Sequence, residues 1–171
     1  MLEVRIARDR RSRILGVVVA LTLILVGAMS AEAQQVQTFA GSSCQASGSV
    51  QDLSYSGVLI ANRTNNQKSA VCPIVRSNGV ERWWLIEVFV RDRHSTQDIT
   101  CVAQARDVTG TAGTGWSETQ SSAGEGDQTL VFGAPGTDLP DYGPYTVVCS
   151  LPPMEEVNQP SYIASYLIVE P

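Results

Sequence analysis

Apolar and polar positions alternate with a period of two through most of the chain after residue 33, and the spacing of a surface helix does not occur there. The clearest run is 82–91. One of its faces carries Trp84, Ile86, Val88 and Val90, and the other carries Trp83, Leu85, Glu87, Phe89 and Arg91. Because the first face is entirely apolar, we expect it to face the core.

Similar alternation predicts strands at 36–40, 57–62, 69–75, 128–132, 145–151 and 163–169, one around Cys101, and weaker ones at 50–55 and 116–119. Clusters of Gly, Pro, Asn and Ser between them predict turns. Residues 109–127 hold five glycines, and Trp116 is their only large apolar residue, so we expect a long surface excursion there. The pattern predicts an all-β fold: an antiparallel two-sheet sandwich of about eight strands, either jelly-roll or immunoglobulin-like.

The first 33 residues have a different character. Five arginines precede an uninterrupted apolar stretch at 14–27, and the small residues Ala31 and Ala33 follow it. This order is typical of a signal peptide cleaved after Ala33. The apolar stretch is shorter than the roughly 20 residues that a membrane span needs. We therefore expect a signal peptide at 1–33, one domain at 34–171, a secreted or periplasmic location, and no membrane span after cleavage.

Charge narrows the classes of partner. The chain carries a formal charge of −5, and loss of five Arg and three acidic residues with the leader leaves 7 basic and 14 acidic residues, or −7. From Asp107 onward there are nine acidic residues and neither Lys nor Arg. Nucleic-acid binding is disfavoured, because it depends on basic side chains that neutralise phosphates.

The acidic residues raise the question of a bound cation. Glu125, Asp127, Asp138 and Asp141 are candidates for structural calcium, but none lies in the alternating oxygen-ligand pattern of a calcium loop. A solvated acidic surface is the favoured interpretation, and we expect no other cofactor.

Cys44, Cys72, Cys101 and Cys149 all lie after the leader. An even number in an exported domain predicts two disulfides, and the wide spacing disfavours zinc. Sequence alone allows three pairings. Pairing 101 with 149 is sterically sensible, because both cysteines lie on inward faces of their strands, as a bridge through a sandwich core requires.

Residues for covalent catalysis are scarce. His94 is the single histidine, and it lies in the polar segment 91–95, where we expect a solvated turn side chain. No nucleophile motif accompanies it, so no catalytic residue is assigned. Asn62-Arg63-Thr64 matches an N-glycosylation acceptor, a tripeptide that often arises by chance.

The outward face of 82–91 is the candidate binding surface. Trp83 and Phe89 flank Glu87 beside Arg91, and aromatic rings with polar neighbours can hold a sugar or a partner chain. The alternative is that a loop or terminal strand covers this face.

Two resemblances support the sandwich. Asp141, Gly143 and Tyr145 before Cys149, with Trp84 twelve residues after Cys72, resemble the tyrosine corner and Cys-Trp-Cys pattern of immunoglobulin-like domains, although Tyr145 precedes the cysteine by four residues instead of two. The segments 39–44, 71–76, 100–101, 145–152 and 165–166 are similar to small exported bacterial proteins without an assigned activity. That resemblance implies an envelope or extracellular location and a disulfide-linked β-sandwich, and no functional residues.

We therefore expect an exported, non-catalytic β-sandwich that binds a glycan or a protein at the cell surface or outside it. A secreted hydrolase with its site in the loops and a structural envelope protein without a small ligand remain the alternatives. The oligomeric state stays open.

Overall fold

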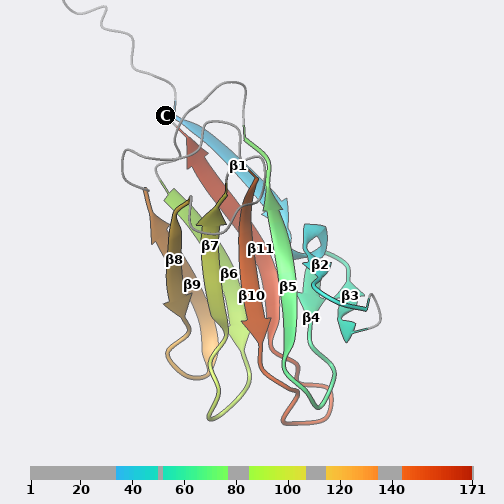
Figure 1. The fold of residues 1–171 in the computed structure, drawn as a ribbon. Coiled ribbons are helices and arrows are strands. Elements are labelled where there is room, and N and C mark those ends of the chain that lie inside the picture. The colour runs from blue at the N-terminus through green and yellow to red at the C-terminus, as the bar shows by residue number, and fades with distance from the viewer. Residues whose placement is uncertain (1–33, 50–51, 77–84, 107–114, 135–143, 171) are drawn as a thin grey trace, which may run out of the picture. The chain divides into compact units, whose positions relative to one another are not determined.

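The computed structural model describes residues 34–49, 52–76, 85–106, 115–134 and 144–170. These residues form eleven strands and one 3-10 helix (Figure 1). The elements are β1 (Gln35–Ala40), η1 (Gly41–Ser43), β2 (Gln45–Ala46), β3 (Ser54–Ser56), β4 (Leu59–Ala61), β5 (Lys68–Ile74), β6 (Leu85–Asp92), β7 (Thr100–Ala105), β8 (Ser117–Ser121), β9 (Gly126–Gly133), β10 (Tyr145–Leu151) and β11 (Tyr162–Glu170).

The strands make two antiparallel sheets that face each other. Sheet A has the order β3-β4-β11-β6-β9, and β1 also pairs with β11. Sheet B has the order β2-β5-β10-β7-β8. From β4 to β11 the chain passes repeatedly between the sheets, which gives β4-β11-β6-β9 against β5-β10-β7-β8, the arrangement of a jelly roll. The two-sheet prediction is confirmed. The short strand β3 overlaps the weak candidate at 50–55, whereas β2 has only two residues, too few for alternation to show.

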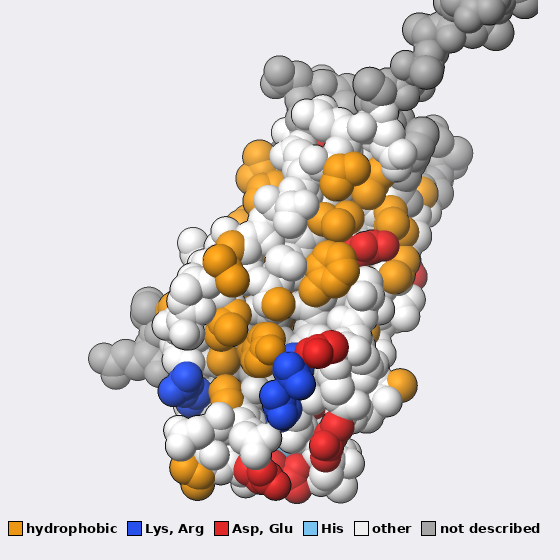
Figure 2. Space-filling model, turned by 180° about the vertical axis from the view of Figure 1, so that it is seen from behind, with side chains coloured by type: hydrophobic (Ala, Val, Ile, Leu, Met, Phe, Trp, Pro, Cys, Tyr) orange, Lys and Arg blue, Asp and Glu red, His pale blue; other side chains and the backbone are white. Residues whose placement is uncertain are grey.

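The core fills the space between the sheets, and the predicted inward face of β6 is confirmed. Ile86, Val88 and Val90 are buried, whereas Trp83 and Trp84 lie outside the described residues. The neighbouring strand β9 contributes Phe132, and β10 of the facing sheet contributes Val147. Each such buried side chain stabilises the fold by roughly 1.5–3 kcal/mol. The outer face of sheet A is different, because hydrophobic, acidic and basic side chains are interspersed on it (Figure 2).

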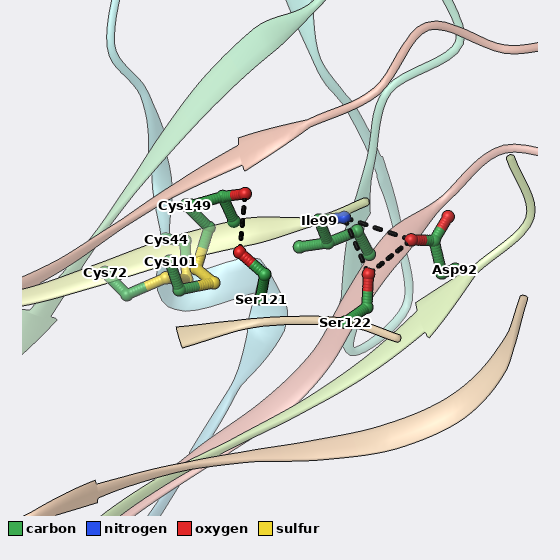
Figure 3. Close-up of a disulfide and its surroundings, with 9 residues drawn as sticks. Cys44, Cys72, Asp92, Ile99, Cys101, Ser121, Ser122 and Cys149 are labelled. Atoms are coloured by element: carbon green, nitrogen blue, oxygen red, sulfur yellow. Dashed lines mark hydrogen bonds between the residues drawn. A yellow bond between two sulfur atoms is a disulfide. The ribbon is translucent and has the colours of Figure 1, made fainter. Parts of the chain in front are cut away.

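The disulfides are Cys44–Cys72 and Cys101–Cys149, which confirms the predicted two disulfides and the pairing of Cys101 with Cys149. The expected bridge through the sandwich core is wrong, because Cys101 and Cys149 lie directly opposite each other on β7 and β10 of sheet B. Alternation correctly predicts that both side chains face inward, but it does not show to which sheet each strand belongs. This also differs from the inter-sheet disulfide of immunoglobulin domains. Figure 3 shows the four cysteines grouped in the core.

Two further expectations are corrected or extended. The surface excursion predicted for 109–127 is wrong in part, because β8 and the start of β9 lie in it; residues 107–114 are outside the described ranges. The Ser- and Thr-rich β8 forms a strand because it pairs with β7 at the edge of sheet B. The described residues contain no helix with the length and apolar character that crossing a membrane requires.

Candidate functional site

The outer face of sheet A is built around the outward positions of β6, and strand register aligns them in rows with β9 and β11. Arg91 lies opposite Asp127 on one side and Tyr162 on the other. In the next row, Phe89 lies opposite Thr129 and Ser165. The rows beyond them are more apolar and include Glu87 with Val131 and Leu167, then Leu85 with Gly133 and Val169.

A β-bulge in β11 interrupts this grid. Ile163 pairs with Val90, but Phe89 pairs with Ser165, so Ala164 is the extra residue. Ile163 and Tyr166 are therefore both buried although they are three residues apart, and Tyr162 is left half-buried. Bulges re-aim side chains in this way and often lie beside binding sites. Here the bulge places the smallest side chain of the segment, Ala164, between two aromatic residues, Phe89 and Tyr162.

A hollow of about 300 Å³ lies at this bulge and is open to solvent. Phe89, Tyr162 and Ala164 line it together with Asp127, Thr129 and the backbone neighbours Val90 and Gln128. Its volume lies at the lower end of the range of small-ligand sites, which combine apolar walls with a few polar groups. Three neighbouring strands supply the lining, so the hollow rests on rigid backbone.

The polar side chains that line the hollow differ in whether they already make hydrogen bonds with described residues. Gln128 makes two: its Nε2 donates to the Gly124 carbonyl at 2.6 Å, and its Oε1 accepts from the Ala123 N–H at 2.7 Å. These bonds hold the turn between β8 and β9. In the described part of the chain, no hydrogen bond involves the hydroxyls of Thr129 and Tyr162. Both hydroxyls can therefore bond to a ligand or to water.

Arg91 adds a positive charge beside the hollow. Its Nε lies 3.3 Å from Asp127 Oδ1, and the two side chains are 35% and 71% exposed. The Nε atom is itself buried and makes no hydrogen bond of good geometry to the described residues, so the contact with Asp127 is an ion pair only. Such an exposed pair is weak, typically below about 1 kcal/mol.

The sequence analysis identified part of this surface. Glu87, Phe89 and Arg91 share one half-buried face of β6, as the alternation predicts, while Trp83 lies outside the described residues. The sequence analysis did not predict that Phe89 shares this surface with Tyr162, Asp127 and Thr129. The sequence gives only a weak indication of it, because strand pairing between distant segments and a one-residue bulge bring these residues together.

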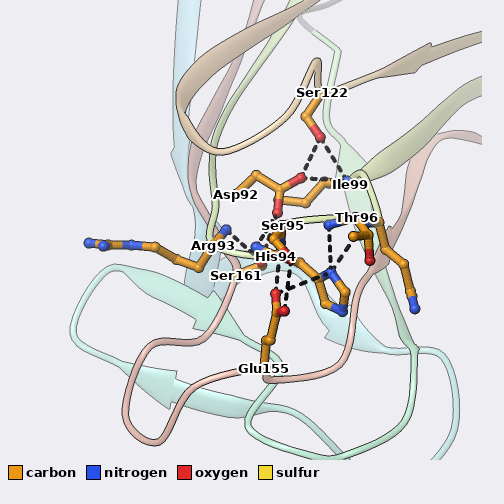
Figure 4. A network of polar contacts seen from close by, with 10 residues as sticks. Asp92, Arg93, His94, Ser95, Thr96, Ile99, Ser122, Glu155 and Ser161 are labelled. Carbon is orange, nitrogen blue, oxygen red and sulfur yellow. Dashed lines mark hydrogen bonds and ion pairs between the residues drawn. The ribbon is translucent and has the colours of Figure 1, made fainter.

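His94 occupies a polar network at the end of the sandwich where β6 and β11 meet the loops (Figure 4). The expectation of a solvated side chain is wrong, because His94 is only 8% exposed. Its Nδ1 accepts hydrogen bonds from the backbone N–H groups of Thr96 at 3.2 Å and Gln97 at 3.1 Å, which closes the turn. In the described residues the imidazole makes no hydrogen bond with a serine, and the loop-borne hydrolase stays an untested alternative.

The same network is centred on Asp92, which is fully buried. Its Oδ1 accepts from the His94 N–H at 3.0 Å and the Ser161 hydroxyl at 3.1 Å. Its Oδ2 accepts from the Ile99 N–H at 3.0 Å and the Ser122 hydroxyl at 2.5 Å. Asp92 thus joins three loops, and its role is structural.

Two other sequence features remain, the glycosylation tripeptide and the acidic candidates for calcium. Asn62 is fully buried; its Nδ2 lies 2.8 Å from the carbonyl oxygens of Asn66 and Pro152, and its Oδ1 accepts from the Thr64 N–H and hydroxyl. It is therefore inaccessible to glycosylation in the folded domain. Of the calcium candidates, Asp138 and Asp141 lie outside the described residues, and the described residues contain no cluster of three metal-ligating side chains.

Comparison with known proteins gives distant structural similarity only. No protein-family model matches the sequence, and no curated protein matches it. A xylan-binding module, CBM86, from Roseburia intestinalis is 12% identical over 80% of this chain and 96% of its own, with a TM-score of 0.48.

Two further solved structures are similarly distant. A β-(1,4)-mannanase with a CBM35 module from Podospora anserina is 13% identical over 80% of this chain and 28% of its own, with a TM-score of 0.45. A CBM6 module of a laminarinase from Zobellia galactanivorans is 13% identical over 78% of this chain and 98% of its own, with a TM-score of 0.34. The function is therefore inferred only from this chain's own residues.

Proposed function

We propose that this domain is a non-catalytic carbohydrate-binding module whose site is the outer face of sheet A, centred on the hollow between Phe89 and Tyr162. The bulge at Ala164 carries the proposal, because it separates two aromatic side chains on neighbouring strands and leaves a sugar-sized space between them. The apolar face of a pyranose ring packs against aromatic rings, and its hydroxyls need hydrogen-bonding partners at the edge. Thr129, Tyr162 and Asp127 supply such partners.

The geometry favours a sugar over a protein partner. The hollow is small, and the hydroxyls at its rim make no hydrogen bond with the residues that the structure describes. A protein interface of standard size, in contrast, buries about 800 Å² on each partner around large apolar anchors. The polymer would lie along the remaining outward positions of β6, where half-buried Glu87 and Leu85 continue the face.

Binding can be measured by affinity electrophoresis of the purified, oxidised protein through gels that contain soluble polysaccharides, followed by calorimetry on those that retard it. We expect Phe89→Ala and Tyr162→Ala each to weaken binding by at least about tenfold, since each removes a wall of the hollow. Val157→Ala is the control, because Val157 is an exposed loop residue that does not line the hollow. Unchanged retardation of both aromatic variants, with folding intact, would contradict the proposed site.

We also infer that the domain acts outside the cytoplasm. Its two disulfides are of the kind that persists in oxidising compartments, and the order of charges and apolar residues in 1–33 is that of an export signal. The boundary after Ala33 stays a prediction, because residues 1–33 lie outside the described ranges. Mass spectrometry of the exported protein tests it: a mature chain that begins at Gln34 and contains no free thiol is expected.

A further inference from the structure

We propose that the hollow between Phe89 and Tyr162 selects uncharged polysaccharide chains and rejects polyanionic ones such as uronic-acid or sulfated polymers. This inference rests on the proposed carbohydrate-binding function and names the class of ligand that the site takes. It follows from the charges of the outer face of sheet A.

Arg91 is the single basic residue among the outward positions of β1, β6, β9 and β11 in the described part of the chain. Two acidic residues, Glu87 and Asp127, share this face, so its formal charge is −1. The Asp127 carboxylate, which already lies 3.3 Å from Arg91 Nε, offsets part of the attraction that Arg91 would exert on an anionic sugar. A neutral sugar can bind without breaking this ion pair.

Glu87 adds to the preference for neutral over anionic polysaccharides. It lies two residues from Phe89 on the same face of β6, at a distance of about 6.6 Å along the strand. Its row neighbours, Val131 and Leu167, are apolar, and no described residue forms an ion pair with it. A carboxylate that has no ion-pair partner among the described residues and lies within a Debye length of the hollow, about 10 Å at 0.1 M salt, repels each negative charge of a bound chain.

The rest of the domain adds to this local field. Besides Asp127, eight acidic residues and no Lys or Arg lie from Asp107 to the end of the chain. A single-sign field of this kind lowers the local concentration of polyanions and leaves neutral polymers unaffected. Hydrogen bonds from Thr129 and Tyr162 need no charge on the ligand.

The test uses three polymers, each beside its carboxymethylated form: hydroxyethylcellulose, guar galactomannan and laminarin. Affinity electrophoresis of the full protein at low salt is expected to show that the protein binds the neutral member of at least one pair about tenfold more tightly than the charged member. This ratio of affinities should fall when the salt concentration is raised. The double variant Glu87→Gln/Asp127→Asn is expected to reduce the ratio at least about threefold, because it binds the charged polymer more tightly than the wild type does. Glu155→Gln/Glu156→Gln removes the same total charge at residues of the loop before β11 that do not line the hollow, and it serves as the control.

The two proposals fail in different ways. Binding of carboxymethylated chains as tightly as neutral ones, or an equal effect of both double variants, overturns the selectivity and leaves carbohydrate binding intact. If the protein binds none of the polymers, neutral or charged, both the carbohydrate-binding function and the selectivity are overturned.

Discussion

The hydroxyl of Tyr166 on β11 donates a hydrogen bond of 2.8 Å to the backbone carbonyl of Pro73 on β5, so that one side chain reaches from sheet A to sheet B. Tyr166 is 1% exposed, and its ring stacks on that of Phe39, with 5.0 Å between the ring centroids. Burial raises the pKa of Tyr166 to about 12 from an ordinary value of 10. The contact that joins the sheets therefore requires a protonated phenol.

Alkaline pH should destabilise the domain through Tyr166. Between pH 10 and pH 12 the unfolded chain has lost this phenolic proton while the folded chain retains it, so ionisation favours the unfolded state. The contribution of Tyr166 is complete below pH 10 and falls as pH rises toward 12, by at most about 3 kcal/mol. Urea unfolding at a series of pH values measures this decline.

Tyr166→Phe supplies the comparison, because it removes the titrating group and keeps the ring. At pH 8 it should cost about 1 kcal/mol, the usual net value of one hydrogen bond. Above pH 10 its stability should fall less steeply than that of the wild type, since the other tyrosines contribute equally to both proteins. Parallel curves would show that Tyr166 does not titrate differently in the two states.

Much of the fold could be predicted from alternation, since the faces of β6 and β10 are those that the sequence indicates. Alternation predicts which side chains of a strand are buried, but it does not predict which strands are neighbours. The disulfide shows the difference: the inward direction of Cys101 and Cys149 was predictable, and their position on adjacent strands of one sheet was not. That position depends on contacts between segments 48 residues apart.

The candidate site was predictable to the same extent. Phe89 and Arg91 lie on one strand, so their common face follows from the period of two. Tyr162 joins them only because β11 pairs with β6 and because Ala164 bulges, and a bulge leaves no composition signal in a segment of this kind. His94 was misjudged for another reason: the residues that follow it are polar and exposed, but its own ring is buried and its backbone N–H bonds to the buried carboxyl of Asp92.

Gly41 should not tolerate a side chain. It is buried where η1 packs on β11, and an added Cβ would overlap the backbone carbonyl oxygen of Ile163, which strand pairing with β4 and β6 holds in place. We expect Gly41→Ala to lower the free energy of unfolding by about 2 kcal/mol or more, measured by urea unfolding. Gly133→Ala is the control: its nearest neighbour would be Glu118 Oε2 at 4.0 Å, so a change within about 0.5 kcal/mol is expected. Equal losses in both variants would contradict the steric argument.

Acid should weaken one loop contact specifically. The backbone N–H and the hydroxyl of Ser95 both donate to the Glu155 carboxylate at 2.7 Å, and these hydrogen bonds hold the pKa of Glu155 below its ordinary value of 4.5. A lowered pKa contributes stability above pH 4.5 and loses it as pH falls through the folded-state value.

Glu155→Gln tests this contact. The variant should be slightly less stable than the wild type at pH 7, and the difference should vanish at the acid end of a series of thermal unfolding experiments. A direct measurement of the Glu155 pKa by NMR titration should give a value below 4.5. A difference in stability that persists unchanged to the lowest pH would assign the effect to packing and not to the carboxylate.

Asp92 should be the polar residue on which the loop end of the sandwich depends most. Asp92→Ala would remove the carboxylate that accepts from two backbone N–H groups and two hydroxyls in a buried site. The Ile99 N–H would keep its second acceptor, Ser122 Oγ at 2.8 Å, and each donor left unsatisfied costs about 1–3 kcal/mol. After partial relaxation and water entry, we expect a loss of roughly 3–5 kcal/mol in urea unfolding.

Asp92→Asn separates shape from acceptor capacity, because the amide keeps the size of the carboxyl and replaces one acceptor oxygen by a donor that faces donors. Its loss should be smaller than that of Asp92→Ala and still larger than that of Asp98→Ala, an exposed residue whose carboxyl accepts one long hydrogen bond of 3.2 Å from Gly124. If Asp92→Asn were as stable as the wild type, the four donors would not depend on a carboxylate. Since those donors come from three separate loops, the variant should also increase hydrogen exchange at Ile99, whose N–H points at Asp92 Oδ2, before it affects the strands.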